Sequence, residues 1–110
     1  MYRYIWKIKL KDSTSEQKFI QHWHDGSKIL QEYDGALGTH IHRVRDEPGS
    51  FFLVAEWQSI EARDAMNADA EEGKSERSVR WKKFPPNDSF GEIISFAGEE
   101  IGAVFPETKN

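Results

Sequence analysis

Apolar and polar side chains alternate over the first residues of the chain. The apolar side chains occupy the even positions, namely Tyr2, Tyr4, Trp6, Ile8 and Leu10. Arg3, Lys7 and Lys9 lie on the odd positions together with Ile5. Successive side chains of a strand point to opposite faces, and aromatic and β-branched residues favour strands. The pattern therefore predicts a strand over residues 2–10 with one buried face.

The next segment changes to helical spacing. Thr14 followed three residues later by Gln17 matches a capping box and predicts a helix start. Apolar residues then recur at spacings of three, four and seven, at Phe19, Ile20, Trp23, Leu30 and Tyr33, which predicts one apolar stripe facing a sheet. Asp34-Gly35 predicts the helix end, because glycine suits the left-handed position that follows a helix.

Two further strands, two helical segments and a last strand follow. We expect strands over residues 36–45 and 51–57, joined by a turn that contains Pro48 and Gly49. The third strand is almost continuously apolar, so we expect it to be central and covered on both faces. Ser59 predicts a helix to about Gly73, residues 75–84 a further helical segment closed by two prolines, and residues 90–96 the last strand. This β-α-β-β-α-β order predicts a single α+β domain over residues 1–110, ferredoxin-like with an antiparallel sheet.

One face of such a sheet has no helix to cover it. On the third strand Phe51, Leu53 and Ala55 point to one side, while Phe52 and Val54 point to the other with Glu56. An exposed apolar sheet face is unusual in a monomer, so we expect a homodimer in which two sheets pack face to face. Residues 98–110 are then a tail that contacts the partner. The alternative is a monomer whose tail folds back over its own sheet.

Composition narrows the class of partner. The net charge of −4 argues against nucleic acid as the main partner. The chain has no cysteine, which leaves no disulfide, thiol nucleophile or cysteine metal site and suits a reducing cytoplasm. No stretch approaches the roughly 18 apolar residues of a membrane span. We therefore expect a cytoplasmic protein that binds neither nucleic acid nor membrane.

Three segments together resemble a known family. They are Ile5-Trp6-Lys7 leading to residues 19–23 (FIQHW), residues 34–43 (DGALGTHIHR), and residues 51–59 (FFLVAEWQS) opening a helix with Glu61-Ala62. In this order, over residues 3–72, they resemble the antibiotic-biosynthesis-monooxygenase-like branch of the dimeric α+β barrel superfamily. The resemblance implies a dimer with a pocket between each sheet and its own helices.

The same resemblance implies a function. Enzyme members of the family oxidise phenolic or quinol-like substrates with dioxygen and without a cofactor, so the chain is expected to be a cofactor-independent monooxygenase acting on a small aromatic, quinol or polyketide-like molecule. The alternative is a non-catalytic dimeric module that binds a small hydrophobic metabolite. A related branch degrades haem with an asparagine, a tryptophan and a histidine. At those places this chain has Trp6, Met66 and about Glu76, so haem degradation is disfavoured.

Several residues are candidates for a site in that pocket. We expect Tyr4, His22 and Asn67 to be catalytic: Tyr4 could hydrogen-bond a bound phenol, His22 borders the apolar stripe of its helix, and Asn67 is a poor helix former next to an inward-facing methionine. For these residues the alternatives are a core tyrosine, a half-buried surface histidine and an exposed asparagine. The expected pocket-lining residues are Trp6, Trp23, Trp57 and Met66.

Other polar residues have weaker functional interpretations. His40 and His42 share one face of a strand and could bind a divalent metal, but no third ligand is evident; a solvent-facing or interface-facing pair is the alternative. Arg80 could approach a bound anion, although its basic helix reads more simply as a solvated face. Trp81 points away from the apolar side of that helix, so it could cover the pocket mouth or pack on a partner.

Overall fold

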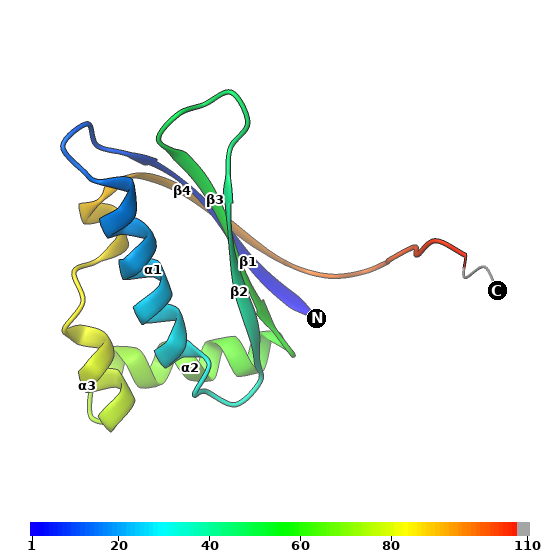
Figure 1. Cartoon of the computed structure of the whole chain (residues 1–110). Helices are drawn as coiled ribbons and strands as arrows, with labels where there is room; N and C mark the ends of the chain where they lie inside the picture. The colour runs from blue at the N-terminus through cyan, green and yellow to red at the C-terminus, as the bar shows by residue number, and fades with distance from the viewer. Residues whose placement is uncertain (108–110) are drawn as a thin grey trace.

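A four-stranded antiparallel sheet forms one layer of the protein, and the helices form the other (Figure 1). The computed structural model describes residues 1–107. The strands are β1 (Tyr2–Leu10), β2 (Ala36–Arg43), β3 (Ser50–Trp57) and β4 (Gly91–Glu99), in the spatial order β2-β3-β1-β4. The helices are α1 (Glu16–Leu30), α2 (Ile60–Glu72) and α3 (Glu76–Lys82), followed by a short 3-10 turn, η1 (Asn87–Ser89). This arrangement confirms the ferredoxin-like α+β fold.

Helix α1 begins one residue later than its capping pattern predicts. The hydroxyl of Ser15, and not that of Thr14, accepts the backbone N–H of Lys18. Thr14 instead donates to the carbonyl oxygen of Phe90 at 3.3 Å, which ties the start of the helix to the strand β4 side of the fold. The helix also ends earlier, at Leu30, so that Tyr33 lies in the turn that follows.

The strand ends differ from the expected ones in two places. Strand β2 ends at Arg43 and not at residue 45, and β4 continues to Glu99, where it still pairs with Tyr2 of β1. Gly98 therefore belongs to the sheet and not to the tail. Residues 108–110 of the expected tail lie outside the described residues.

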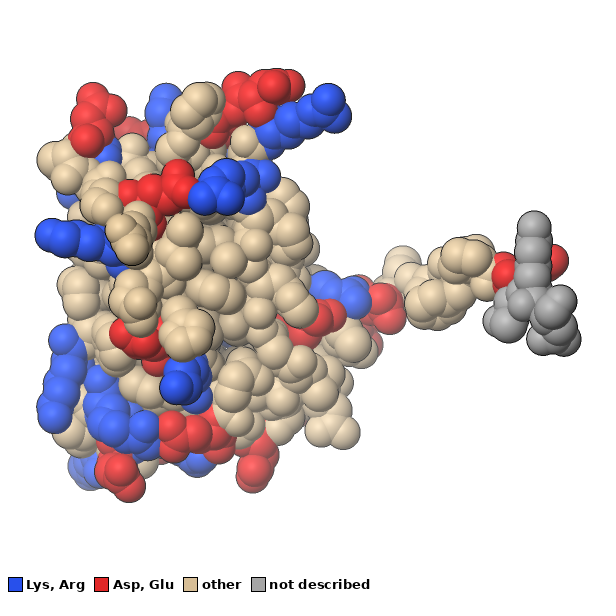
Figure 2. All heavy atoms as spheres, viewed as in Figure 1, with Lys and Arg blue, Asp and Glu red and all other residues tan. Residues whose placement is uncertain are grey.

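The described part of the tail does not fold back over the sheet. It leaves the body of the molecule after β4 and stands clear of it (Figures 1 and 2). Ile101 and Val104 are almost fully exposed, at 98% and 97%. The monomeric alternative, in which the tail covers its own sheet, is therefore not what residues 1–107 form.

The core lies between the sheet and the helices, in two clusters. One packs Ile8, Phe51 and Leu53 of the sheet against Phe19 of α1. The other packs Trp57 of β3 against Met66 of α2 and Tyr33. Burial of large aromatic side chains dominates the stabilisation of so small a domain.

The opposite face of the sheet is uncovered in the single chain. Strand β3 is central, as its apolar run predicts. The expectation that both of its faces are covered is wrong for the single chain, since Phe52 on the outer face is 38% exposed. Ile94 and Phe96 of β4 point to the same side and are 70% and 61% exposed. We call this face, with Ile5, Phe52, Val54, Ile94 and Phe96, the outer sheet face. Among residues 1–107, no helix is long and apolar enough to cross a membrane.

Candidate functional site

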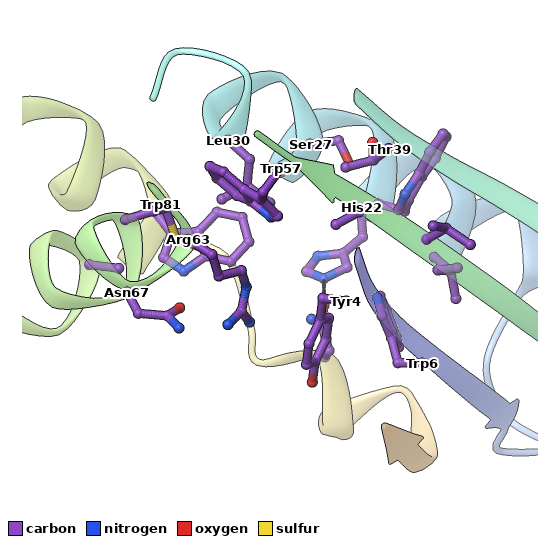
Figure 3. Close-up of a pocket in the computed structure, with 18 residues that line it drawn as sticks. Tyr4, Trp6, His22, Ser27, Leu30, Thr39, Trp57, Arg63, Asn67 and Trp81 are labelled. Atoms are coloured by element: carbon purple, nitrogen blue, oxygen red, sulfur yellow. Dashed lines mark hydrogen bonds between the residues drawn. The ribbon is translucent and has the colours of Figure 1, made fainter. Parts of the chain in front are cut away.

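A hollow of about 200 Å³ opens between the helix-facing side of the sheet and the helices (Figure 3). Its walls are mainly aromatic, and they include every tryptophan of the chain: Trp6, Trp23, Trp57 and Trp81. Apolar, concave sites with a few convergent polar groups are typical of small-molecule binding. An engineered cavity of about 150 Å³ holds a benzene ring, so this hollow is large enough for a small aromatic molecule.

Local sequence patterns position each wall. The alternation of β1 turns Tyr4 and Trp6 toward the helices, and Trp57 ends β3 on the same side. Helix α1 contributes His22 and Trp23, and the next turn of the same helix contributes Gly26 and Ser27. Residues three and four apart share a helix face, so Arg63, Met66 and Asn67 reach the hollow together from α2.

The hollow brings together all seven residues that we expect to be catalytic or pocket-lining, but not His40, His42 or Arg80. Its wall contains the expected catalytic residues Tyr4, His22 and Asn67, and the expected lining residues Trp6, Trp23, Trp57 and Met66. Their chemical roles depend on the geometry of the polar atoms.

Arg63 lines the hollow beside Tyr4. Its guanidinium carbon lies 4.3 Å from the centre of the Tyr4 ring, a cation–π arrangement. Figure 3 shows the Arg63 side chain extending from α2 toward Tyr4, with Asn67 one helical turn further along. Within residues 1–107, no carboxylate forms an ion pair with Arg63 and no side chain hydrogen-bonds to it. Arg63 is not among the site residues expected from the sequence. The spacing of four between Arg63 and Asn67 nevertheless places both on one helix face.

His22 is held in place on both sides. Its Nε2 lies 2.8 Å from Oδ1 of Asn87, so in this arrangement Nε2 carries the hydrogen and donates it. Its ring also packs on Phe90, with the ring centres 4.4 Å apart, and on Phe84. Nδ1 then carries the lone pair, and it is buried without a hydrogen-bond partner among the described residues. Asn87 is a second site residue that the sequence analysis missed.

The indole N–H of Trp57 is also unpaired. Trp57 is only 2% exposed, and its Nε1 has no acceptor among residues 1–107. Buried donors are paired in most proteins, so an unpaired one calls for an explanation. Trp57 thus lines the hollow and carries a buried N–H donor without an acceptor among the described residues.

Trp81 lines the hollow from α3. Its ring lies against Gly26 of α1, where an added Cβ would lie 3.0 Å from Cζ3 of Trp81. Arg80 does not approach the hollow. Its guanidinium makes two hydrogen bonds, of 2.7 and 2.6 Å, to the carboxylate of Glu32, which favours the simpler interpretation of its helix as a solvated face.

Comparison with known proteins identifies the family. The family model for antibiotic biosynthesis monooxygenases matches residues 1–71, which is more than half of the chain. The chain belongs to the antibiotic biosynthesis monooxygenase family. No curated protein shows significant sequence similarity to it.

Solved structures of this monooxygenase family share the fold. SnoaB, a cofactor-independent oxygenase from Streptomyces nogalater, is 12% identical with a TM-score of 0.71, and the match covers 96% of this chain and 97% of SnoaB. An antibiotic biosynthesis monooxygenase from Bordetella bronchiseptica is 17% identical with a TM-score of 0.66, covering 91% and 96%. One from Nitrosomonas europaea is 12% identical with a TM-score of 0.66, covering 93% and 100%. At these identities the likeness establishes the fold.

Two of the three residues that disfavour haem degradation on the basis of the resemblance lie in the hollow. Trp6 and Met66 line the hollow as apolar walls. Glu76 begins α3, and its side chain is 89% exposed. His22 is the only histidine in the described wall of the hollow, and both of its ring nitrogens are occupied or enclosed.

His40 and His42 lie on the outer sheet face, away from the hollow. Nε2 of His40 is 2.9 Å from Glu56, and Arg3 also contacts this carboxylate. The hydrogen bond from His40 is the main reason that the pKa of Glu56 lies below its ordinary value, and Arg3 adds to it. His42 stacks on the ring of Phe52 at 4.3 Å. In the described chain no three histidine, aspartate or glutamate side chains form a group that could hold a metal ion.

Proposed function

We propose that this family member is a cofactor-independent monooxygenase that oxidises a small aromatic or quinol-like molecule with dioxygen. The observation that carries the proposal is the tryptophan-walled hollow, whose lining includes the polar side chains of Tyr4, Arg63 and Asn67, with Arg63 over the Tyr4 ring. Apolar walls would hold an aromatic ring and exclude water, and these polar groups would stabilise the substrate's anion, which is the electron donor to oxygen. The relative SnoaB supports the proposal as a cofactor-independent oxygenase.

The proposed reaction balances for a substrate with an activated ring methylene, such as an anthrone. Loss of one proton gives a resonance-stabilised carbanion, which passes an electron to dioxygen. The resulting radical pair combines to a peroxide anion with a new C–O bond, and this anion takes back the first proton to give a hydroperoxide. Loss of the second C–H proton then breaks the O–O bond, and the hydroxide that leaves takes up this proton to become water. Overall the methylene becomes a carbonyl, one oxygen atom enters the product, and the other leaves as water.

We assign roles to the three candidate catalytic residues on this basis. The hydroxyl of Tyr4 would hydrogen-bond the substrate oxygen, and the amide of Asn67 would donate to the developing anion. His22 would accept the first proton on Nδ1, the nitrogen that carries the lone pair when Nε2 donates to Asn87. Nδ1 is buried, so the His22 ring must shift for this atom to reach a substrate. Hydrogen bonds of catalytic residues often shorten in this way only when the substrate is bound.

Oxygen uptake tests the proposal. Chelator-treated, flavin-free protein should consume dioxygen when given anthrones or naphthoquinols. His22→Gln should lower the rate by about 100-fold or more, the usual contribution of a general base. His24→Gln is the matched control, because His24 is exposed on the same helix and should leave the rate unchanged. A folded protein that gives no uptake above buffer with any of these substrates contradicts the proposal.

One observation favours a second function, a non-catalytic module that binds a small hydrophobic metabolite. His22 offers no freely accessible nitrogen in the empty hollow, because Asn87 holds Nε2 and aromatic packing encloses Nδ1. Tight binding of an aromatic ligand without oxygen uptake, equally strong in His22→Gln, would support this module over the enzyme.

We further propose that the chain forms a homodimer through its outer sheet face and acts in the cytoplasm. In support, Ile94 and Phe96 form an exposed apolar strip beside Ile5 and Val54. The tail beyond β4, with exposed Ile101 and Val104, extends where a partner could bind it. The absence of cysteine suits a reducing compartment.

A further inference from the structure

The described wall of the hollow carries a cation and no carboxylate. Arg63 is permanently charged, it is half-buried, and it lies over Tyr4. No aspartate or glutamate is among the described residues that line this hollow. A neighbouring hollow beyond Asn67 and Trp81 does include Glu71 and Lys82, but these side chains do not line the one that contains Arg63.

The basic residues nearby differ from Arg63 in having partners. Arg80 is paired with Glu32, and Arg77 donates to the backbone oxygen of Glu32 and contacts Asp69. Arg3 is paired with Glu56 and Glu100 on the outer sheet face. Arg63 thus stands out among the arginines of the helical side, because its charge is held against an aromatic ring and not against a carboxylate.

Other donors accompany this charge. The Asn67 amide reaches the hollow one helical turn from Arg63 (Figure 3). The indole N–H of Trp57, which also lines the hollow, has no acceptor in the described chain. A guanidinium, an amide and an indole N–H can all donate to a negatively charged oxygen, and charge-assisted hydrogen bonds are the strong ones.

We propose that the hollow selects aromatic molecules that carry a negative charge on or beside the ring, as a carboxylate or an ionised phenol, and that Arg63 holds this charge. The inference rests on the proposed function in treating the hollow as the substrate site. It narrows the substrate class from small aromatic molecules to aromatic acids. An acidic group bound to Arg63 would also set the orientation of the ring relative to His22.

A binding experiment without oxygen separates this inference from the proposed reaction. The probes are 1-hydroxy-2-naphthoate and 1-hydroxy-2-naphthamide, which have nearly the same shape but differ in charge. Their affinities are measured by anaerobic titration calorimetry. The variants are Arg63→Gln, which removes the charge, Arg63→Lys, which keeps it, and Arg45→Gln, a control at an exposed arginine far from the wall of the hollow. Circular dichroism checks that each variant is folded.

The native protein and Arg45→Gln should bind the naphthoate about tenfold or more tightly than the naphthamide, as expected for one hydrogen bond to a charged group. Arg63→Gln should bind both within about threefold of each other, and Arg63→Lys should recover part of the preference. Equal affinities in the native protein, an unchanged preference in Arg63→Gln, or no binding of either probe would overturn the inference. A clear preference with no oxygen uptake would instead overturn only the proposed reaction.

Discussion

Gly35 shows how a single residue links the local chain to the packing around the site. Its φ of +85° is in the left-handed region, as the Asp34-Gly35 pair predicts. The structure adds a second reason, because a Cβ at this position would lie 2.5 Å from the Cβ of Ala62 on α2. The carbonyl of Gly35 also accepts the backbone N–H of Gln58 at the end of β3. One glycine therefore fixes the approach of α2 to the turn after α1.

Replacement of this glycine should be costly. Gly35→Ala places a side chain in a strained backbone region and against Ala62, so we expect a loss of about 1–3 kcal/mol in the free energy of unfolding. Gly102→Ala is the control, because nothing lies within 4 Å of its added Cβ. Urea denaturation measures both. If the two variants unfold at the same midpoint, the close approach is not a constraint.

At the scale of elements, one carboxylate joins the three helices. Asp69 of α2 accepts hydrogen bonds of 2.6 Å from the hydroxyl of Tyr33, in the turn after α1, and from that of Ser75, which caps α3. Arg77 of α3 lies over the Tyr33 ring at 4.0 Å. The hydrogen bond from Ser75 is the largest cause of the lowered pKa of Asp69, followed by the one from Tyr33. These contacts hold α3, and with it Trp81, against the hollow.

This cluster makes stability depend on pH. Folding lowers the pKa of Asp69, so the ionised carboxylate stabilises the folded protein. This stabilisation is fully present above the pKa of Asp69 in the unfolded chain, about 4, and is lost as the pH falls through the lower pKa of the folded protein. Asp69→Asn should therefore have a lower urea midpoint than the native protein at pH 7, and the difference should shrink below about pH 4. Asp64→Asn, which removes the same charge at an exposed position of the same helix, is the matched control. A difference that is constant with pH would contradict the role of the charge.

At the scale of the whole molecule, the uncovered sheet face remains the main argument for a dimer. A sheet with helices on one side only leaves the other apolar surface in water unless a partner covers it. Ile94 and Phe96 are too exposed to be stabilised within one chain. Two copies related by a two-fold axis would bury both strips at once.

A charge on this face should prevent association. We expect Phe96→Glu to elute as a monomer by size-exclusion chromatography with light scattering, since dimerisation would bury an unpaired carboxylate. Val79→Glu places the same charge at an exposed apolar position on α3, on the other side of the sheet, and should remain dimeric. A native protein that is monomeric at every concentration, or a Phe96→Glu variant that still dimerises, would contradict the proposed interface.

The sequence predicts local order well and long-range polar contacts poorly. Alternation in β1 and helical spacing in α1 and α2 depend on near neighbours, and Tyr4, His22 and Asn67, which these patterns single out, all line the hollow. The partner of His22 is 65 residues away, at Asn87, and the partner of Arg80 is 48 residues away, at Glu32. No local pattern reveals such pairs, and the sequence gives no sign that Arg63 has no carboxylate partner among the described residues while Arg80 has one.

If the proposed function holds, the hollow transfers one oxygen atom from dioxygen to an aromatic molecule. Isotopically heavy dioxygen in ordinary water tests this transfer, with metal-free, flavin-free protein, an oxidisable aromatic acid as substrate and mass spectrometry of the product. We expect a product that contains one heavy oxygen atom. A product whose new oxygen comes from water, or no product from a folded protein that binds the substrate, would contradict it.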